Sequence, residues 1–182
     1  MEFDAATAGV GPGGLISQSE IRILICYILD TVKEPVPATE LCELLYYERI
    51  ANIFEVSDCI EHLEKSGHIE KAESDSEAYV ITKSGSDIAA ALKTAVSLSI
   101  RERACLATVK MLAKIRNSKE TDIAISREGD FTYITCSALD NGMPIVSVKL
   151  LVNDEVQANA IKTRFLDNPT EIYLKLIDLF TN

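Results

Sequence analysis

The segment NIFEVSDCIEHLEKSGHIEK, residues 52–71, carries the clearest structural signal in the sequence. Its apolar residues recur at the spacing of one helical face and form a single stripe: Val56, Cys59, Ile60 and Leu63. The helix is predicted over 54–66, because Gly67 follows where a left-handed C-terminal cap belongs. Two strand-like runs, 68–73 and 78–82, come next and flank a short polar tip. We therefore predict a helix followed by a β-hairpin.

Two further helices are predicted before this segment. The first covers residues 21–32 and is apolar on more than one face, so it should be buried on two sides. The second lies before a linker at 46–53 and has leucines facing inward. A short helix over 86–92 follows the hairpin. The order helix, helix, helix, strand, strand, helix is typical of a winged helix-turn-helix.

The second half of the chain predicts a small α+β domain. A long helix over 100–116 leads into three strand-like runs, 121–127, 131–139 and 143–152. Asn141-Gly142 joins the last two runs and is a strong signal for a tight hairpin. Two helices, over 154–166 and 170–180, close the chain. We expect a three-stranded antiparallel meander packed against helices.

Two apolar patterns in this half predict the faces that meet. On the last strand the alternating residues should form a buried face: Val146, Val148, Leu150 and Val152. On the last helix the inward stripe should consist of Ile172, Leu176, Ile177 and Phe180.

Several helix starts have recognisable signals. Ser17-x-x-Glu20 and Ser99-x-x-Glu102 have the spacing of capping boxes, and Thr39 lies near the cap of the second helix. Asn168 is placed to cap the last helix, with Pro169 as its first residue.

The chain therefore divides into three predicted parts: an arm at 1–16, a winged-helix domain at 17–96 and an α+β domain at 97–182. Residues 9–14 match G-x-G-x-x-G, the phosphate-binding loop of dinucleotide sites. No strand fits before Gly9 and Pro12 stiffens the turn, so we interpret the segment as a flexible N-terminal arm.

Charge is unevenly distributed along the 182 residues, whose net charge is −10. Residues 1–100 carry −10, residues 101–119 carry +5 and residues 120–182 carry −5. An acidic total argues against non-specific coating of nucleic acid and against an anionic membrane surface. The longest apolar run, Ile23–Leu29, is too short to cross a bilayer, and the start of the chain does not read as a secretory signal. We expect a cytoplasmic protein.

Chemistry-bearing residues are sparse. The five cysteines form no C-x-x-C pair and fall inside apolar patterns, as buried, reduced thiols do. His62 and His68 do not share a helical face, so a metal site is not predicted. The sequence has no P-loop, H-E-x-x-H or G-x-S-x-G motif. We expect no enzymatic activity and no cofactor.

Four segments together resemble one known family: TAGVGPGGL (7–15), SEIRILICYIL (19–29), NIFEVSDCIEHLEKSG (52–67) and DNPTEIYLKLI (167–177). The chain resembles a bacterial family of winged-helix proteins catalogued as domain of unknown function 4364. The resemblance implies a winged-helix fold and a role as a predicted transcriptional regulator. It supplies no active site.

If the third helix and the hairpin bind DNA, the residues able to do so are Arg49, Asn52, Ser57, His62, Lys65, Lys71 and Lys83. The predicted outward face of that helix nevertheless carries four acids, Glu55, Asp58, Glu61 and Glu64, against one permanent base. The hairpin tip adds Asp75 and Glu77. Carboxylates repel phosphates, so this face fits DNA poorly.

Residues 101–119 form the one basic patch, which includes Arg101, Arg103, Lys110 and Lys114. Three interpretations stay open: a solvated helix face, docking on the acidic half of the same or a partner subunit, or contact with the DNA backbone.

Two functions follow from these patterns. The first is a homodimeric DNA-binding transcriptional regulator that binds double-stranded DNA and uses its C-terminal domain for dimerisation or effector sensing. The alternative is an acidic winged-helix protein-protein interaction module whose third helix meets a protein partner and does not bind DNA.

Overall fold

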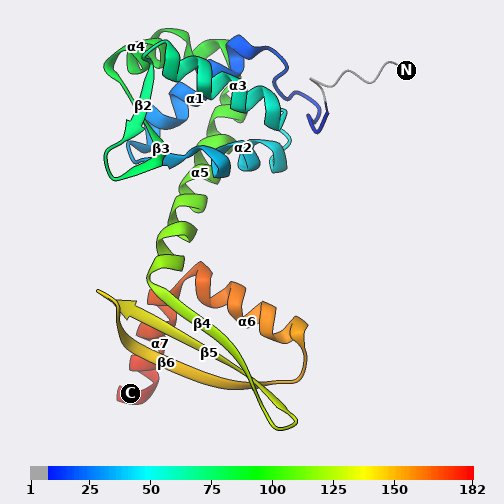
Figure 1. The fold of residues 1–182 in the computed structure, drawn as a ribbon, viewed down its shortest axis with the longest axis vertical. Helices are drawn as coiled ribbons and strands as arrows, with labels where there is room; N and C mark the ends of the chain where they lie inside the picture. The colour runs from blue at the N-terminus through cyan, green and yellow to red at the C-terminus, as the bar shows by residue number, and fades with distance from the viewer. Residues whose placement is uncertain (1–7) are drawn as a thin grey trace. The chain divides into compact units, whose positions relative to one another are not determined.

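A computed structural model describes residues 8–182, and Figure 1 shows the order of the elements along the chain. The chain forms two compact units, residues up to Met111 and residues from Leu112, and the division falls inside one helix, α5 (Leu98–Lys119). Each unit contains a three-stranded antiparallel sheet. The protein is therefore α+β, as its sequence predicts.

The N-terminal unit contains the predicted order of three helices, a hairpin and a further helix. Its elements are α1 (Gln18–Val32), β1 (Val36–Pro37), α2 (Ala38–Tyr47), α3 (Ile53–Lys65), β2 (Ile69–Ala72), β3 (Asp75–Ile81), α4 (Lys83–Leu92) and η2 (Lys93–Ala95), followed by α5. The strand β1 was not predicted. It pairs with β3 through Val36 and Tyr79, so the sheet order is β1-β3-β2.

The core of this unit forms around α1, which packs against α3, α4, β3 and η2. Ile21, Leu24 and Ile28 are fully buried, as expected for a helix that is apolar on several faces. On its second face Ile23 is also buried, and the Arg101 guanidinium lies 5.0 Å from the centre of the Tyr27 ring. The second face of α1 is therefore covered within its own unit, as the prediction of burial on two sides requires.

The hairpin is tighter than predicted. Ala72 pairs with Asp75, so the turn consists of Glu73 and Ser74 alone, and a bulge lies between Lys71 and Ala72. The Asp75 carboxylate accepts a hydrogen bond from the Glu77 backbone N–H at 3.0 Å, within the first three residues of β3.

Both predicted capping boxes are wrong. Ser17 is the N-cap of α1, but its side chain makes no capping hydrogen bond within the described part of the chain. Helix α5 begins at Leu98, one position before Ser99, because the Ser97 carbonyl already accepts the Arg101 N–H. Helix α2 begins at Ala38 with Pro37 as its N-cap, so Thr39 lies in the first turn, near the cap as predicted.

The C-terminal unit consists of β4 (Thr121–Glu128), β5 (Phe131–Asp140), β6 (Met143–Val152), α6 (Glu155–Asp167) and α7 (Pro169–Thr181). The strands form a meander in the order β4-β5-β6. Asn141 and Gly142, with φ of 50° and 79°, make the predicted turn. Asn168 accepts the Glu171 N–H at 3.1 Å, and Pro169 opens α7, also as predicted.

The two apolar faces predicted in this unit are covered only in part. The buried core contains Ile134, Cys136, Val152 and Phe165, which come from β5, β6 and α6. On β6, Leu150 remains 42% exposed, and on α7 Phe180 is 82% exposed. Among the described residues of α7 only Pro169 is buried. Helices α6 and α7 therefore cover the middle of the sheet and leave apolar surface beside it.

Candidate functional site

Helix α3 presents the larger part of its surface to solvent. Its buried residues are the predicted stripe, Val56, Cys59, Ile60 and Leu63. The remaining positions are half-buried or exposed, and most of them are polar: Glu55, Ser57, Asp58, Glu61, His62, Glu64 and Lys65. The outward, carboxylate-rich face predicted from the sequence is therefore present.

Three of the four carboxylates on this face have partners. Glu61 forms an ion pair with Lys65 at 3.3 Å on the same helix, and Glu55 accepts a hydrogen bond from Gln18 at 2.9 Å. Glu64 accepts a hydrogen bond of 2.7 Å from the Tyr79 hydroxyl on β3. Desolvation, together with this bond to Glu64, raises the pKa of Tyr79 to about 12. The permanent cations beside these four carboxylates are Lys65 and Arg22 of α1, which lines one surface hollow together with Asp58 and Glu61. Carboxylates still outnumber bases, so the face stays anionic.

The hairpin beside α3 adds more negative charge. Exposed carboxylates lie along it at Glu70, Glu73, Asp75 and Glu77. The basic residue among them is Lys71, whose ammonium lies 6.0 Å from the centre of the Tyr79 ring. We call α3 and this hairpin together the acidic face.

Asn52 has a structural role instead of the predicted DNA contact. Its side chain is 4% exposed and accepts the Phe54 N–H at 2.9 Å, which caps α3. The side-chain amide donates a hydrogen bond of 2.8 Å to the Ala8 carbonyl. This amide is therefore not available to a nucleic acid, and we no longer count Asn52 among the candidate DNA-contacting residues.

The other predicted DNA-contacting residues lie apart from one another along the unit. Ser57, His62 and Lys65 project from α3, whereas Arg49 belongs to the turn before it, in a left-handed conformation with φ of 57°. Lys83 lies on α4, where it pairs with Asp87 at 3.0 Å. The four basic side chains of the predicted set, Arg49, Lys65, Lys71 and Lys83, thus come from four different elements.

Residues 8–15 of the predicted arm are held against the turn between α2 and α3. The Gly11 N–H donates to the Arg49 carbonyl at 2.9 Å, and the Leu15 N–H donates to the Ile50 carbonyl at 2.7 Å. A Cβ on Gly14 would lie 2.9 Å from both of those carbonyl oxygens, so only glycine fits this approach. The part of the arm before Ala8 lies outside the described residues.

An exposed aromatic residue at the start of α3 was missed in the sequence. Phe54 is 76% exposed, and Tyr47 at the end of α2 is exposed to the same extent. Both residues lie outside the apolar stripes of α2 and α3, and this spacing predicts that their side chains are exposed. Exposed aromatic side chains are more typical of protein interfaces than of a solvated helix.

The basic patch of α5 is partly engaged with the N-terminal unit. Arg101 stacks on Tyr27 and donates to the Val96 carbonyl at 3.1 Å, while the Arg103 guanidinium lies 3.9 Å from Glu48. Lys110 and Lys114 are exposed.

No group of three His, Cys, Asp or Glu side chains in residues 8–182 is arranged to hold a metal ion. The five cysteines are free, and burial raises the pKa of Cys26, Cys42 and Cys59 to about 11. Within the same range no helix has the length and apolar character needed to span a membrane.

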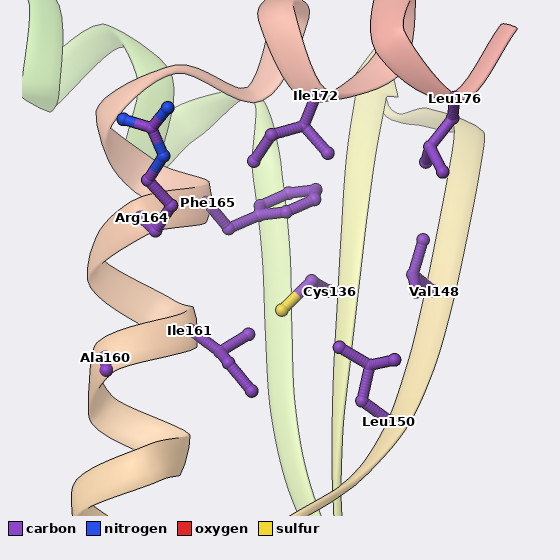
Figure 2. Close-up of a pocket in the computed structure, with 9 residues that line it drawn as sticks. All are labelled: Cys136, Val148, Leu150, Ala160, Ile161, Arg164, Phe165, Ile172 and Leu176. Carbon is purple, nitrogen blue, oxygen red and sulfur yellow. The ribbon is translucent and has the colours of Figure 1, made fainter. Parts of the chain in front are cut away.

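The C-terminal unit contains a second candidate site, an apolar cavity of about 400 Å³ (Figure 2). The sheet contributes Cys136, Val148 and Leu150 to its lining. Helices α6 and α7 contribute the other residues, which are Ala160, Ile161, Arg164, Phe165, Ile172 and Leu176. Arg164 is the one charged residue of this lining.

Comparison with known proteins gives one match, to a family model. Neither the curated proteins nor the solved structures contain a match to this sequence. The family described as Domain of unknown function (DUF4364) matches residues 21–180. This range includes α3, the hairpin and the C-terminal cavity, and the chain therefore belongs to the DUF4364 family.

Proposed function

We propose that this protein is a homodimeric winged-helix regulator whose acidic face binds a basic protein surface and does not bind DNA. The observation that carries the proposal is the row of exposed carboxylates on α3 and the hairpin. Asp58 and Glu61 project from the helix, and Glu73, Asp75 and Glu77 from the hairpin, where a DNA-binding winged helix needs bases.

The magnitude of the charge term supports this choice. A carboxylate at contact distance from a phosphate costs roughly 1–4 kcal/mol, depending on the local dielectric. Lys65, Lys71 and Arg22 are outnumbered by the carboxylates of this face, and Lys65 is already paired with Glu61. With a basic protein surface each of these carboxylates would be attracted and not repelled. Phe54, exposed at the edge of the same face, supplies an apolar contact.

The dimer is supported by apolar surface on α7. Leu174 and Ile177 are exposed. Helical spacing places Leu174 opposite Ile172 and Leu176, which line the cavity, and Ile177 on the flank between the two sides. Phe180 continues the apolar surface at the end of the helix. Exposed apolar surface of this kind is typical of subunit interfaces. The five free cysteines fit a reducing, cytoplasmic location.

The test is cross-linking mass spectrometry in native lysate with the wild-type chain and an Asp58→Lys/Glu61→Lys variant. We expect one stoichiometric basic partner, cross-linked near α3, that is lost from the variant. A matched control is Asp122→Lys/Glu155→Lys, which makes the same charge change in the C-terminal unit. Recovery of the same partner by all three proteins would contradict the proposal.

The second candidate function is sequence-specific binding of double-stranded DNA, with transcriptional regulation as its result. The observation that favours it is the element order of the N-terminal unit together with the sheet order β1-β3-β2, which fits a DNA-binding winged helix. Fluorescence anisotropy with promoter fragments at ~50 and ~200 mM salt decides between the two. Salt-dependent binding by the wild-type dimer would support DNA binding, whereas no binding at either concentration supports the first proposal.

A further inference from the structure

We propose that the cavity of the C-terminal unit binds a small aliphatic carboxylate, whose apolar chain fills the cavity and whose carboxylate pairs with Arg164. The inference concerns a site separate from the acidic face and does not depend on which macromolecule that face binds.

The lining determines the apolar part of the ligand. Figure 2 shows side chains from three directions around one space: Ile161 and Phe165 from α6, Ile172 from α7 and Leu150 from β6. A volume of about 400 Å³ lies at the lower end of the ~300–1,000 Å³ range of small-molecule sites. An apolar body of modest size is therefore the matching occupant.

The unit has no side chain of its own that fills this space. Among the lining residues Phe165 is buried, but 42% of the Leu150 surface is exposed to solvent. Ile172 and Leu176 are only half-buried. Lining atoms with no neighbours on one side lose dispersion contacts that a ligand would restore.

The single charge at the cavity determines the polar end of the ligand. In Figure 2 the Arg164 guanidinium lies at the edge of the cavity, turned away from the apolar side chains. The guanidinium lies 3.8 Å from the Glu171 carboxylate, which is longer than a hydrogen bond, and Glu171 also forms an ion pair with Lys175. A guanidinium has five donors, so it can bind a carboxylate at this position.

Other ligand classes fit less well. The lining contains no acidic side chain, so a cationic ligand would find no partner there. A sugar or a nucleoside would place several hydroxyl or amide groups against the apolar lining without hydrogen-bond partners, which is unfavourable. An unbranched carboxylate places its one polar group at the edge of the cavity.

The test is isothermal titration calorimetry of the full chain with octanoate, decanoate and decanol. We expect decanoate to bind more tightly than octanoate, by about fourfold for each added methylene. Decanol has the same apolar chain without the charge, and it should bind roughly tenfold more weakly than decanoate.

Two pairs of variants locate the binding. Arg164→Gln should weaken decanoate binding roughly tenfold and leave decanol binding unchanged, whereas Lys162→Gln removes the same charge from the same helix without effect. Leu150→Trp should abolish binding by filling the cavity. Leu151→Trp, on the opposite face of the same strand, should not.

The proposal is overturned if decanoate binds equally well to both tryptophan variants, or if it does not bind the wild-type chain. Light scattering tests the remaining alternative, in which a second copy of the chain occupies the cavity. If Leu150→Trp dissociates a wild-type dimer and decanoate does not bind, a second copy of the chain occupies the cavity, and the ligand proposal is wrong.

Discussion

The Tyr79 hydroxyl of β3 donates a hydrogen bond of 2.7 Å to the Glu64 carboxylate of α3. This bond connects the hairpin to the helix beside it, and both elements belong to the acidic face. The geometry of the proposed interaction surface therefore depends on a tyrosine that must stay protonated to donate.

The first prediction concerns pH. Tyr79 has its pKa raised from 10.0 to about 12, so the folded state holds this proton more tightly than the unfolded state does. The stabilisation from Tyr79 should be complete below pH ~10 and be lost as the pH rises toward 12. Urea unfolding of wild type and Tyr79→Phe at pH 8 and pH 11 measures it. We expect Tyr79→Phe to lower stability by about 1 kcal/mol at pH 8 and by less at pH 11. An equal difference at both pH values would contradict the prediction.

The second prediction concerns the start of α3. Asn52→Ala removes the cap of the helix and a buried amide, so unfolding free energy should fall by about 1–2 kcal/mol. Ser57→Ala, at an exposed position of the same helix, should change it by less than about 0.5 kcal/mol. Chemical denaturation compares the two, and similar losses in both variants would show that the cap is not the cause.

A third prediction concerns the N-terminal segment. Gly14→Ala places a methyl group against the Arg49 and Ile50 carbonyls and should displace residues 8–15 from the turn. Hydrogen exchange should then become faster at the Leu15 amide, which donates to Ile50. The Ile50 amide, which donates to Leu45 inside the unit, serves as the internal control. Unchanged protection at Leu15 would show that the segment tolerates the methyl group.

The fourth prediction concerns the proposed dimer. Leu174→Glu/Ile177→Glu introduces two charges on exposed positions of α7 and should convert the proposed dimer to a monomer. Light scattering at micromolar concentration measures the change in mass. Leu106→Glu/Val109→Glu, at exposed apolar positions of α5, is the matched control and should stay dimeric. A monomeric wild-type protein would rule out the dimer.

Patterns that depend on a single element were predictable from the sequence. The stripe on α3 needs only helical periodicity, and Asn141-Gly142 needs only the geometry of a two-residue turn. The two C-terminal helices and three strands were therefore found within one or two residues of their bounds. Strand β1 of the N-terminal sheet was not predicted, because a strand of two residues is too short to show an alternating pattern.

Features that depend on a neighbour were less predictable. Periodicity identifies which residues share a face but not whether another element covers it. Thus Ile177 and Phe180 fall on the predicted stripe and stay exposed, while the second face of α1 is covered by its own unit. The same reason explains Asn52, whose buried position depends on contact with Ala8, 44 residues away.

The Asn52 side chain links the N-terminal segment to the start of α3, because the same amide group accepts the capping bond of α3 and donates to the Ala8 carbonyl. Proteolytic trimming past Ala8 would remove the acceptor of that hydrogen bond and loosen the first turn of α3, where Phe54 projects. Preparations that differ by a few N-terminal residues should therefore differ in affinity at the acidic face, although no residue of that face has changed.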